Sequence, residues 1–261
     1  MSPRALLRRI DRTAPAAPPR RQPAVAWDNL PDHLWWDPQG PARLLHAMNP
    51  TRTGFFLREL GDPAGQLVVD AGCGGGLVAK ALTQAGATVI GIDPAEPSLA
   101  VARRAAGTRF HPVAARLEQL PLDDGSADAV VAADVLEHVG DLPAAVREIA
   151  RVLRPGGRLL FDTINRTVWA WAVALLGAER LAGLVPRGTH EWRLFIRPDE
   201  LHRLLTGAGL TAVASLGLAP RLRLTPRQVL AAASGRLPPP PFAIGADRRA
   251  SYLGHYRKRQ G

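Results

Sequence analysis

Short apolar runs alternate with amphipathic stretches along most of this chain, and this alternation predicts its secondary structure. The runs are rich in Val, Ile, Leu and Ala, and the stretches between them carry apolar residues at helical spacing. We expect strands over 67–71, 88–92, 109–113, 128–134, 157–163, 211–216 and 251–256. We expect helices over 77–86, 96–106, 141–153 and 198–208. Strands separated by helices predict an α/β protein with a Rossmann-like, doubly wound, mostly parallel seven-stranded sheet.

The segments outside this alternation divide the chain further. Residues 1–24 mix Arg, Pro and Ala without apolar periodicity, which predicts a disordered arm. Residues 25–62 carry aromatic and apolar residues at helical spacing, which predicts a helical cap that contributes to the ligand site of a main domain over 63–217. Residues 165–190 interrupt the alternation as an insert, and 218–261 form a basic tail, rich in Pro and Arg, that ends in the last strand.

Composition and charge limit the classes of protein that this chain can belong to. Its 261 residues are 46% hydrophobic, enough for one α/β domain with appendages. The single cysteine, Cys73, excludes a disulfide framework and a cysteine-built zinc site. The sequence has no run of 18 apolar residues, so we expect no membrane-spanning helix. We therefore expect a cytoplasmic protein.

Positive charge is concentrated at the two ends of the chain. The first 22 residues carry a net charge of +5 and residues 218–261 carry +8, whereas the whole chain carries +10, so the middle is slightly acidic. Basic ends can bind anionic lipid or nucleic acid, or can simply keep a chain soluble. We expect no nucleic-acid partner, because the sequence has none of the interleaved aromatic and basic motifs that nucleic-acid binding uses.

The first strand opens into a glycine-rich turn that predicts a nucleoside site. Residues 68–76 read Val-Val-Asp-Ala-Gly-Cys-Gly-Gly-Gly, and the next strand ends on Asp93, 23 residues after Asp70. A βαβ unit presents a carboxylate to a ribose at this spacing. No Lys-Ser/Thr follows, which excludes a P-loop, so the turn indicates a nucleoside without pyrophosphate, of which S-adenosylmethionine (SAM) is the common example. Asp93 could also be a helix N-cap, because Pro94 follows it.

Three polar side chains follow the strand predicted over 128–134. Asp134, Glu137 and His138 lie within five residues, at the strand end where doubly wound sheets bind their ligands. Two carboxylates and an imidazole suit Mg²⁺, Mn²⁺ or Zn²⁺, or acid–base catalysis. The alternative is that Glu137 and His138 cap the next helix and hold the loop.

These motifs together resemble those of a known family. The elements V-D-A-G-C-G-G-G, G-I-D, D-V-L-E-H-V and L-R-P-G-G are similar to those of class I SAM-dependent methyltransferases. The elements W-W-D at 35–37, N-P-T-R at 49–52 and G-T-H at 188–190 are more particular. They resemble the ubiquinone-biosynthesis O-methyltransferases, which act on polyprenyl-dihydroxybenzoate or demethylubiquinol. The resemblance runs from about Trp35 to Gly209.

The resemblance implies a role for individual residues. SAM would be bound by Arg52, Asp70, Gly72, Cys73, Gly74, Asp93, Leu117, Glu118 and Ala133. Within this set, Arg52 would hold the methionine carboxylate, Asp93 the ribose, and Leu117 and Glu118 the adenine. A divalent cation would be held by Asp134, Glu137 and His138, with Asp134 where the family usually has glutamate. Such a cation would lower the pKa of a phenolic acceptor. Catalytic groups would be His138, His190 and Glu137, although His190 could instead orient a loop.

The activity predicted from these observations is metal-assisted methyl transfer from SAM to a phenol-type, catechol-type or related hydroxyl of a small metabolite. Ubiquinone-precursor 3-O-methylation at the membrane is the close alternative. Methylation of carbon or nitrogen stays open, because the fold does not set the acceptor. A non-catalytic SAM-binding regulator or scaffold is the alternative from another class.

The insert at 165–190 has two interpretations. Its apolar-rich sequence contains Trp169 and Trp171 and is flanked by Arg166 and Arg187, a pattern typical of a helix that lies on anionic membrane lipid. The resemblance implies the same contact, at the inner face of the membrane. A lid packed over the acceptor explains the sequence equally well.

Overall fold

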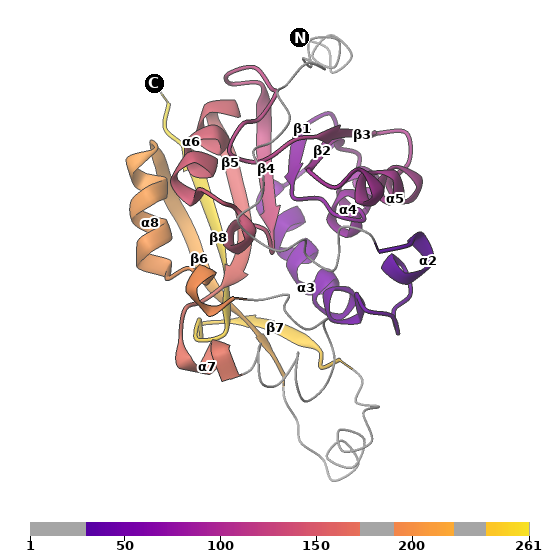
Figure 1. Ribbon diagram of the computed structural model, residues 1–261. Coiled ribbons are helices and arrows are strands. Elements are labelled where there is room, and N and C mark those ends of the chain that lie inside the picture. The colour runs from indigo at the N-terminus through magenta and orange to yellow at the C-terminus, as the bar shows by residue number, and fades with distance from the viewer. Residues whose placement is uncertain (1–29, 173–190, 222–238, 261) are drawn as a thin grey trace.

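A computed structural model describes residues 30–172, 191–221 and 239–260 (Figure 1). In these residues a single sheet forms the centre, with strand order β3-β2-β1-β4-β5-β8-β6-β7. Its strands are β1 (Leu67–Ala71), β2 (Thr88–Asp93), β3 (Phe110–Ala114), β4 (Ala127–Ala133), β5 (Leu153–Ile164), β6 (Leu210–Pro220), β7 (Phe242–Gly245) and β8 (Ser251–Lys258). The helices are α2 (Asp32–Trp35), α3 (Arg43–Leu60), α4 (Leu77–Gln84), α5 (Glu96–Ala106), η1 (Leu136–His138), α6 (Leu142–Val152), α7 (Val168–Trp171), η3 (Trp192–Leu194) and α8 (Pro198–Gly207). The predicted arm at 1–24 lies outside the described residues.

The parallel half of the sheet follows the predicted alternation. β1 pairs with β2 on one side and β4 on the other, β2 pairs with β3, and β4 pairs with β5, all in parallel. Helix α4 connects β1 to β2, α5 connects β2 to β3, and α6 connects β4 to β5. Because the chain moves outward from β1 in one direction and then returns to β4 on its other side, the strand order reverses between β1 and β4. A crevice at the carboxyl ends of the strands is expected at such a switch point.

The other half of the sheet corrects the prediction. β8 lies antiparallel between β5 and β6, and β7 adds an eighth strand, antiparallel to β6. The described sheet therefore has eight strands and not seven, and its β5–β8–β6–β7 half is antiparallel. The prediction missed β7 because it has only four residues, Phe-Ala-Ile-Gly, and directly follows a run of prolines.

The start of β5 also differs from what its sequence suggests. Leu-Arg-Pro-Gly-Gly at 153–157 is typical of a turn that ends a helix. In the structure α6 ends at Val152, and Leu153 already pairs with Ala127. The register then shifts, so that Arg158 lies opposite Ala129. The segment is a bulged strand start, with Gly156 at a φ of 75°.

Helices cover both faces of the sheet and create two apolar layers (Figure 1). One layer is formed with α6 and α8, and the other with α3, α4 and α5. Part of the segment predicted as a cap belongs to the core, because Phe55 and Phe56 of α3 are fully buried in the second layer. This packing fixes α3, and therefore Arg52, against the strand ends.

Candidate cofactor and active site

The glycine turn lies at the switch point between β1 and β4, and its glycines are needed for close packing. Gly72 has a φ of +73°, and a Cβ there would stand 2.3 Å from Val135 Cγ2. Gly76 has a φ of +85°, and its Cβ would stand 2.9 Å from the backbone of Ala102 on α5. Real Cβ atoms do not tolerate such distances, and L-residues rarely adopt these φ values. The turn can therefore keep its shape only with glycine at these positions.

Asp93 fastens this turn to the end of β2. Its Oδ2 accepts a hydrogen bond from the Gly74 N–H at 3.0 Å, and its Oδ1 accepts one from the Ala95 N–H at 2.8 Å. The N-cap of α5 is Ala95 and not Asp93, so the capping alternative is wrong in its register, although Asp93 does satisfy the N–H of the capping residue. A carboxylate oxygen carries more than one lone pair, so these two N–H contacts are compatible with the predicted ribose role of Asp93.

Arg52 is buried beneath the strand ends, with 3% of its surface exposed. Its Nε donates to Asn49 Oδ1 at 3.1 Å, and its Nη1 donates to Asp134 Oδ2 at 2.6 Å. The same Nη1 lies 3.7 Å from Asp162 Oδ2. Burial alone would lower the pKa of Arg52, but the Asp162 and Asp134 carboxylates outweigh burial and raise it. Arg52 is therefore a fixed positive charge at the site.

Two buried acids accompany Arg52. Burial raises the pKa of Asp70 to about 7, although Arg52 and the Ala79 N–H act in the opposite direction. Burial and the neighbouring Asp134 raise the pKa of Asp162 well above its ordinary value. Asp162 is not among the site residues predicted from the sequence. The available signal was an acid at the end of the apolar run Leu-Leu-Phe-Asp, in a strand whose carboxyl end faces the ligand side of the sheet.

The backbone at Asp134 is unusual. Its φ is +49°, and in the described part of the chain it is the sole non-glycine residue with a positive φ. Such conformations cost free energy and persist where the surrounding structure enforces them, often at functional sites. Here the Asp134 N–H donates to the Asp162 carbonyl at 3.2 Å while the side chain pairs with Arg52. Asp134 is therefore held at both its backbone and its carboxylate.

The predicted metal trio is not brought together. Asp134 pairs with Arg52, whereas Glu137 is 2% exposed and its Oε2 accepts from Thr163 Oγ1 at 2.7 Å. His138 is half-buried at the end of η1. Over residues 30–172, 191–221 and 239–260, no three His, Cys, Asp or Glu side chains form a group that could hold a metal ion. The geometry gives no support to the predicted cation. The alternative is wrong about the cap, because Asp141 caps α6 and Glu137 is bonded to Thr163 of β5.

Two further residues predicted to bind the cofactor, Cys73 and Ala133, lie at the ends of neighbouring elements of the sheet. Cys73 is 7% exposed, burial raises the pKa of its thiol, and its Sγ packs against β2 close to Gly91. Ala133 is half-buried at the last position of β4. Neither side chain offers chemistry of its own. The predicted catalytic His190 lies outside the described residues.

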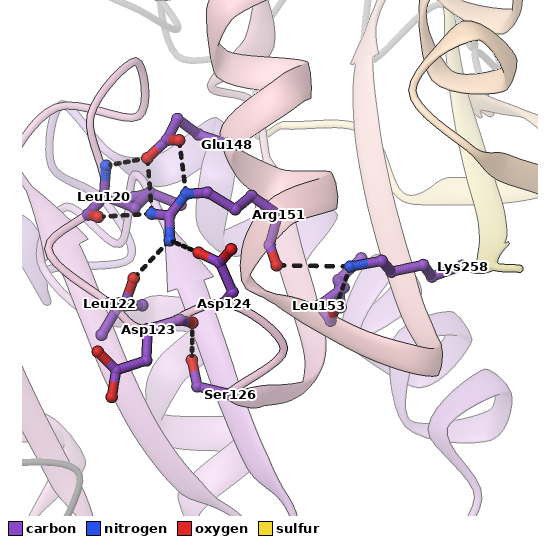
Figure 2. Close-up of polar contacts among 9 residues, drawn as sticks. All are labelled: Leu120, Leu122, Asp123, Asp124, Ser126, Glu148, Arg151, Leu153 and Lys258. Atoms are coloured by element: carbon purple, nitrogen blue, oxygen red, sulfur yellow. Dashed lines mark hydrogen bonds and ion pairs between the residues drawn. The ribbon is translucent and has the colours of Figure 1, made fainter. Parts of the chain in front are cut away.

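The residues predicted to contact adenine lie in a segment that is fastened to α6. Leu117 is buried, and Glu118 Oε1 accepts from the Gly140 N–H at 2.8 Å. Figure 2 shows how Arg151 of α6 holds the rest of this segment. Its guanidinium donates at 2.6–2.9 Å to Leu120 O, Leu122 O, Asp124 Oδ1 and both carboxylate oxygens of Glu148.

Comparison with known proteins gives the family. The family described as "Methyltransferase domain" matches residues 69–161. The ubiquinone biosynthesis O-methyltransferase of Alkalilimnicola ehrlichii is 43% identical over 188 residues, which cover 70% of this chain and 76% of that protein. This chain belongs to the ubiquinone biosynthesis O-methyltransferase family. It is a SAM-dependent methyltransferase.

Solved structures agree on the fold. Magnesium protoporphyrin IX methyltransferase from Synechocystis, with S-adenosylhomocysteine (SAH) bound, has a TM-score of 0.56 at 21% identity, covering 82% of this chain and 85% of its own. A Burkholderia thailandensis 1,6-didemethyltoxoflavin-N1-methyltransferase, also with SAH, has a TM-score of 0.54 at 22% identity, covering 82% and 78%. At these identities the likeness shows the Rossmann-like methyltransferase fold alone.

Proposed function

We propose that this protein transfers the methyl group of SAM to a phenolic hydroxyl of an aromatic quinone precursor, such as a polyprenyl-substituted dihydroxybenzoate or demethylubiquinol. The observation that carries the proposal is the 43% identity, over 70% of the chain, to a protein named for ubiquinone biosynthesis. This identity favours a quinone precursor as the acceptor. A hydroxyl group of an unrelated metabolite is the second candidate acceptor. The same identity favours oxygen over carbon or nitrogen as the methylated atom.

The arrangement at the strand ends supports a cofactor bound across the switch point. On the β2 side, the Asp93 carboxylate would accept hydrogen bonds from the ribose hydroxyls. On the β4 side, Arg52 would offer its buried guanidinium to the methionine carboxylate. A guanidinium fork is well suited to a carboxylate. Leu117 and Glu118 would form the adenine side, with Glu118 bonded to the N–H groups of Gly140 and Asp141 just before α6. SAM, when bound, supplies an electrophilic sulfonium methyl group.

The acceptor oxygen attacks this methyl in line, the C–S bond breaks, and the hydroxyl proton must leave. Holding both reactants in line supplies much of the acceleration. In the part of the chain that the structure describes, His138 is the predicted catalytic side chain that can accept the proton, because it is half-buried while Glu137 is buried against Thr163. No step is assigned to a metal ion, since Asp134 and Glu137 are engaged elsewhere.

The test is methyl transfer from SAM to a short-chain prenyl dihydroxybenzoate, with catechol as the second acceptor and with EDTA in parallel reactions. We expect O-methylated product from the prenylated acceptor, a lower kcat/KM for catechol, and the same rates with EDTA. His138→Gln should lower kcat while leaving the Kd for SAH unchanged. Product from neither acceptor would refute the proposed acceptor class. Loss of activity with EDTA, restored by Mg²⁺, would restore the metal prediction.

A peripheral membrane contact is a second proposal, and it depends on α7. Val168, Trp169 and Trp171 are 76%, 49% and 38% exposed, and Arg249 lies over the Trp169 ring at 5.7 Å. Exposed aromatic side chains beside arginine suit the interface of an anionic bilayer. Among the described residues no helix is long and apolar enough to cross a membrane. Flotation with phosphatidylglycerol vesicles should carry the wild type upward and leave Trp169→Ser with Trp171→Ser behind; equal flotation would refute the contact.

A further inference from the structure

The glycine turn is held from two sides, and only one of them belongs to the sheet. On the sheet side, the N–H groups of Gly72 and Cys73 donate to Ile92 O at 2.7 and 3.0 Å, and the Gly74 N–H donates to Asp93. On the other side lies the indole of Trp35. A Cβ on Gly75 would stand 2.5 Å from Trp35 Cδ2, and a Cβ on Gly74 would stand 3.0 Å from Trp35 Cη2.

Trp35 is itself fixed by the segment before the main domain. It is 4% exposed and packs with Ala42 and with Val101 of α5. Its carbonyl oxygen lies 2.8 Å from His46 Nε2 on α3, which joins α2 to the helix that carries Arg52. A short helix that is anchored in this way transmits its position to the turn that it touches.

We propose that Trp35 is a positioning residue for the cofactor: its indole sets the path of Gly74 and Gly75, against which SAM is held. Trp35 acts through this backbone and does not take part in the chemistry. The inference rests on the proposed function only for the placement of SAM at the glycine turn. Its test is therefore SAH binding, which needs no acceptor.

The neighbouring Trp36 provides a matched control. Trp36 is half-buried in the same segment. The centre of its ring lies 5.8 Å from the centre of the His46 ring and 4.5 Å from Lys80 Nζ. No glycine of the turn has Trp36 among its nearest atoms. Truncation of either tryptophan removes a large aromatic side chain from the same region, but of the two only Trp35 is among the nearest neighbours of the turn glycines.

Gly75 provides an independent probe of the same contact. Gly75 does not have a positive φ, so alanine there meets only the steric obstacle of Trp35. We expect Gly75→Ala to weaken SAH binding strongly in the wild type and much less in Trp35→Ala, where the space has been opened. A double-mutant cycle in the Kd for SAH measures this coupling.

The experiment is calorimetry with SAH on the full-length chain, together with initial rates against SAM. Trp35→Ala should raise the Kd for SAH about tenfold, which is a large effect for one contact. Trp35→Phe should raise it about threefold or less, and Trp36→Ala less than about twofold. The KM for SAM should rise with the Kd while kcat at saturating SAM stays within about threefold, because the contact is made equally before and during methyl transfer.

Equal Kd values for Trp35→Ala and Trp36→Ala, or additive effects of Trp35→Ala and Gly75→Ala, would overturn the inference. If Trp35→Ala does not fold, Trp35→Leu replaces it in the cycle, with the same outcomes. Binding of SAH without transfer to any phenolic acceptor would refute the proposed function and leave the role of Trp35 standing.

Discussion

Replacing Arg151 by Met removes the guanidinium that fastens the segment between β3 and β4 to α6 (Figure 2). Met keeps most of the aliphatic stem, so packing changes little and the loss is mainly one of hydrogen bonds. Five donor–acceptor pairs disappear: two to the carbonyls of Leu120 and Leu122, one to Asp124 and two to Glu148.

The size of the effect follows from the exposure of the partners. The Arg151 side chain is 30% exposed and Glu148 is 20% exposed, so their paired contacts are screened only in part. Asp124 is 81% exposed, so its contact contributes at most about 1 kcal/mol. The carbonyl oxygens lose their donors, which costs less than in a dry core because water can reach part of the site. We expect the free energy of unfolding to fall by about 2–4 kcal/mol in total.

The matched control is Arg154→Met, three residues away. Arg154 donates to one carboxylate oxygen of Asp128 and is 50% exposed, so its loss should cost less than about 1 kcal/mol. Urea unfolding of both variants measures the difference. Calorimetry with SAH should also show a Kd raised about threefold to tenfold in Arg151→Met alone, because the loosened segment carries Leu117 and Glu118 and must be ordered on binding.

The pH dependence provides a further check on the same contact. Burial would raise the pKa of Glu148, but Arg151 and the Leu120 N–H lower it below its ordinary value of 4.5. A carboxyl group whose pKa is lower in the folded than in the unfolded protein stabilises the fold at pH values above its unfolded pKa. This stabilisation is lost as the pH falls through the pKa of the folded protein. The difference between wild type and Arg151→Met should therefore narrow from pH 7 to below pH 4. A difference under 1 kcal/mol at pH 7, or one equal to that of Arg154→Met, would refute the reasoning.

Two other predictions concern the strand ends. Gly72→Ala combines a φ of +73° with a Cβ 2.3 Å from Val135 Cγ2 and should cost about 3 kcal/mol in urea unfolding. Gly209→Ala, with a φ of +87° and no atom within 4 Å, should cost only about 1 kcal/mol; equal losses would contradict this. Burial raises the pKa of Asp70 from 3.8 to about 7, so the cofactor-free protein should lose stability as the pH rises between these values. Asp70→Asn should make this slope smaller in unfolding midpoints at pH 5 and 8, while the contribution of Asp162, whose pKa is also raised, remains. An unchanged slope would mean that Asp70 does not titrate in this range.

The parallel half of the fold could be predicted from the sequence because its signals are local. Each strand is a short apolar run, each connecting helix has its own periodicity, and β1, β2 and α5 begin at the predicted residues. The antiparallel half depends on pairing between distant segments, such as β5 with β8, and a four-residue strand such as β7 has too few positions to show a pattern.

The candidate site divides in the same way. Asp93 and the glycine turn follow directly from the order of strand, turn and helix. Asp162 and Trp35 acquire their roles only through contacts made across the fold, with Arg52 and with Gly75, which no spacing in the sequence reveals. The metal trio stays a prediction without support in the described residues, because Glu137 is bonded to Thr163 on β5 and Asp134 is paired with Arg52.

The most direct test of the account is calorimetry of SAH binding to the wild type and to Asp93→Ala. One molecule of SAH should bind per chain of wild type, and Asp93→Ala should show no measurable heat, because it loses both the ribose acceptor and the bond that holds Gly74. Absence of binding to the wild type, or equal affinity in Asp93→Ala, would contradict a cofactor site at the switch point between β1 and β4.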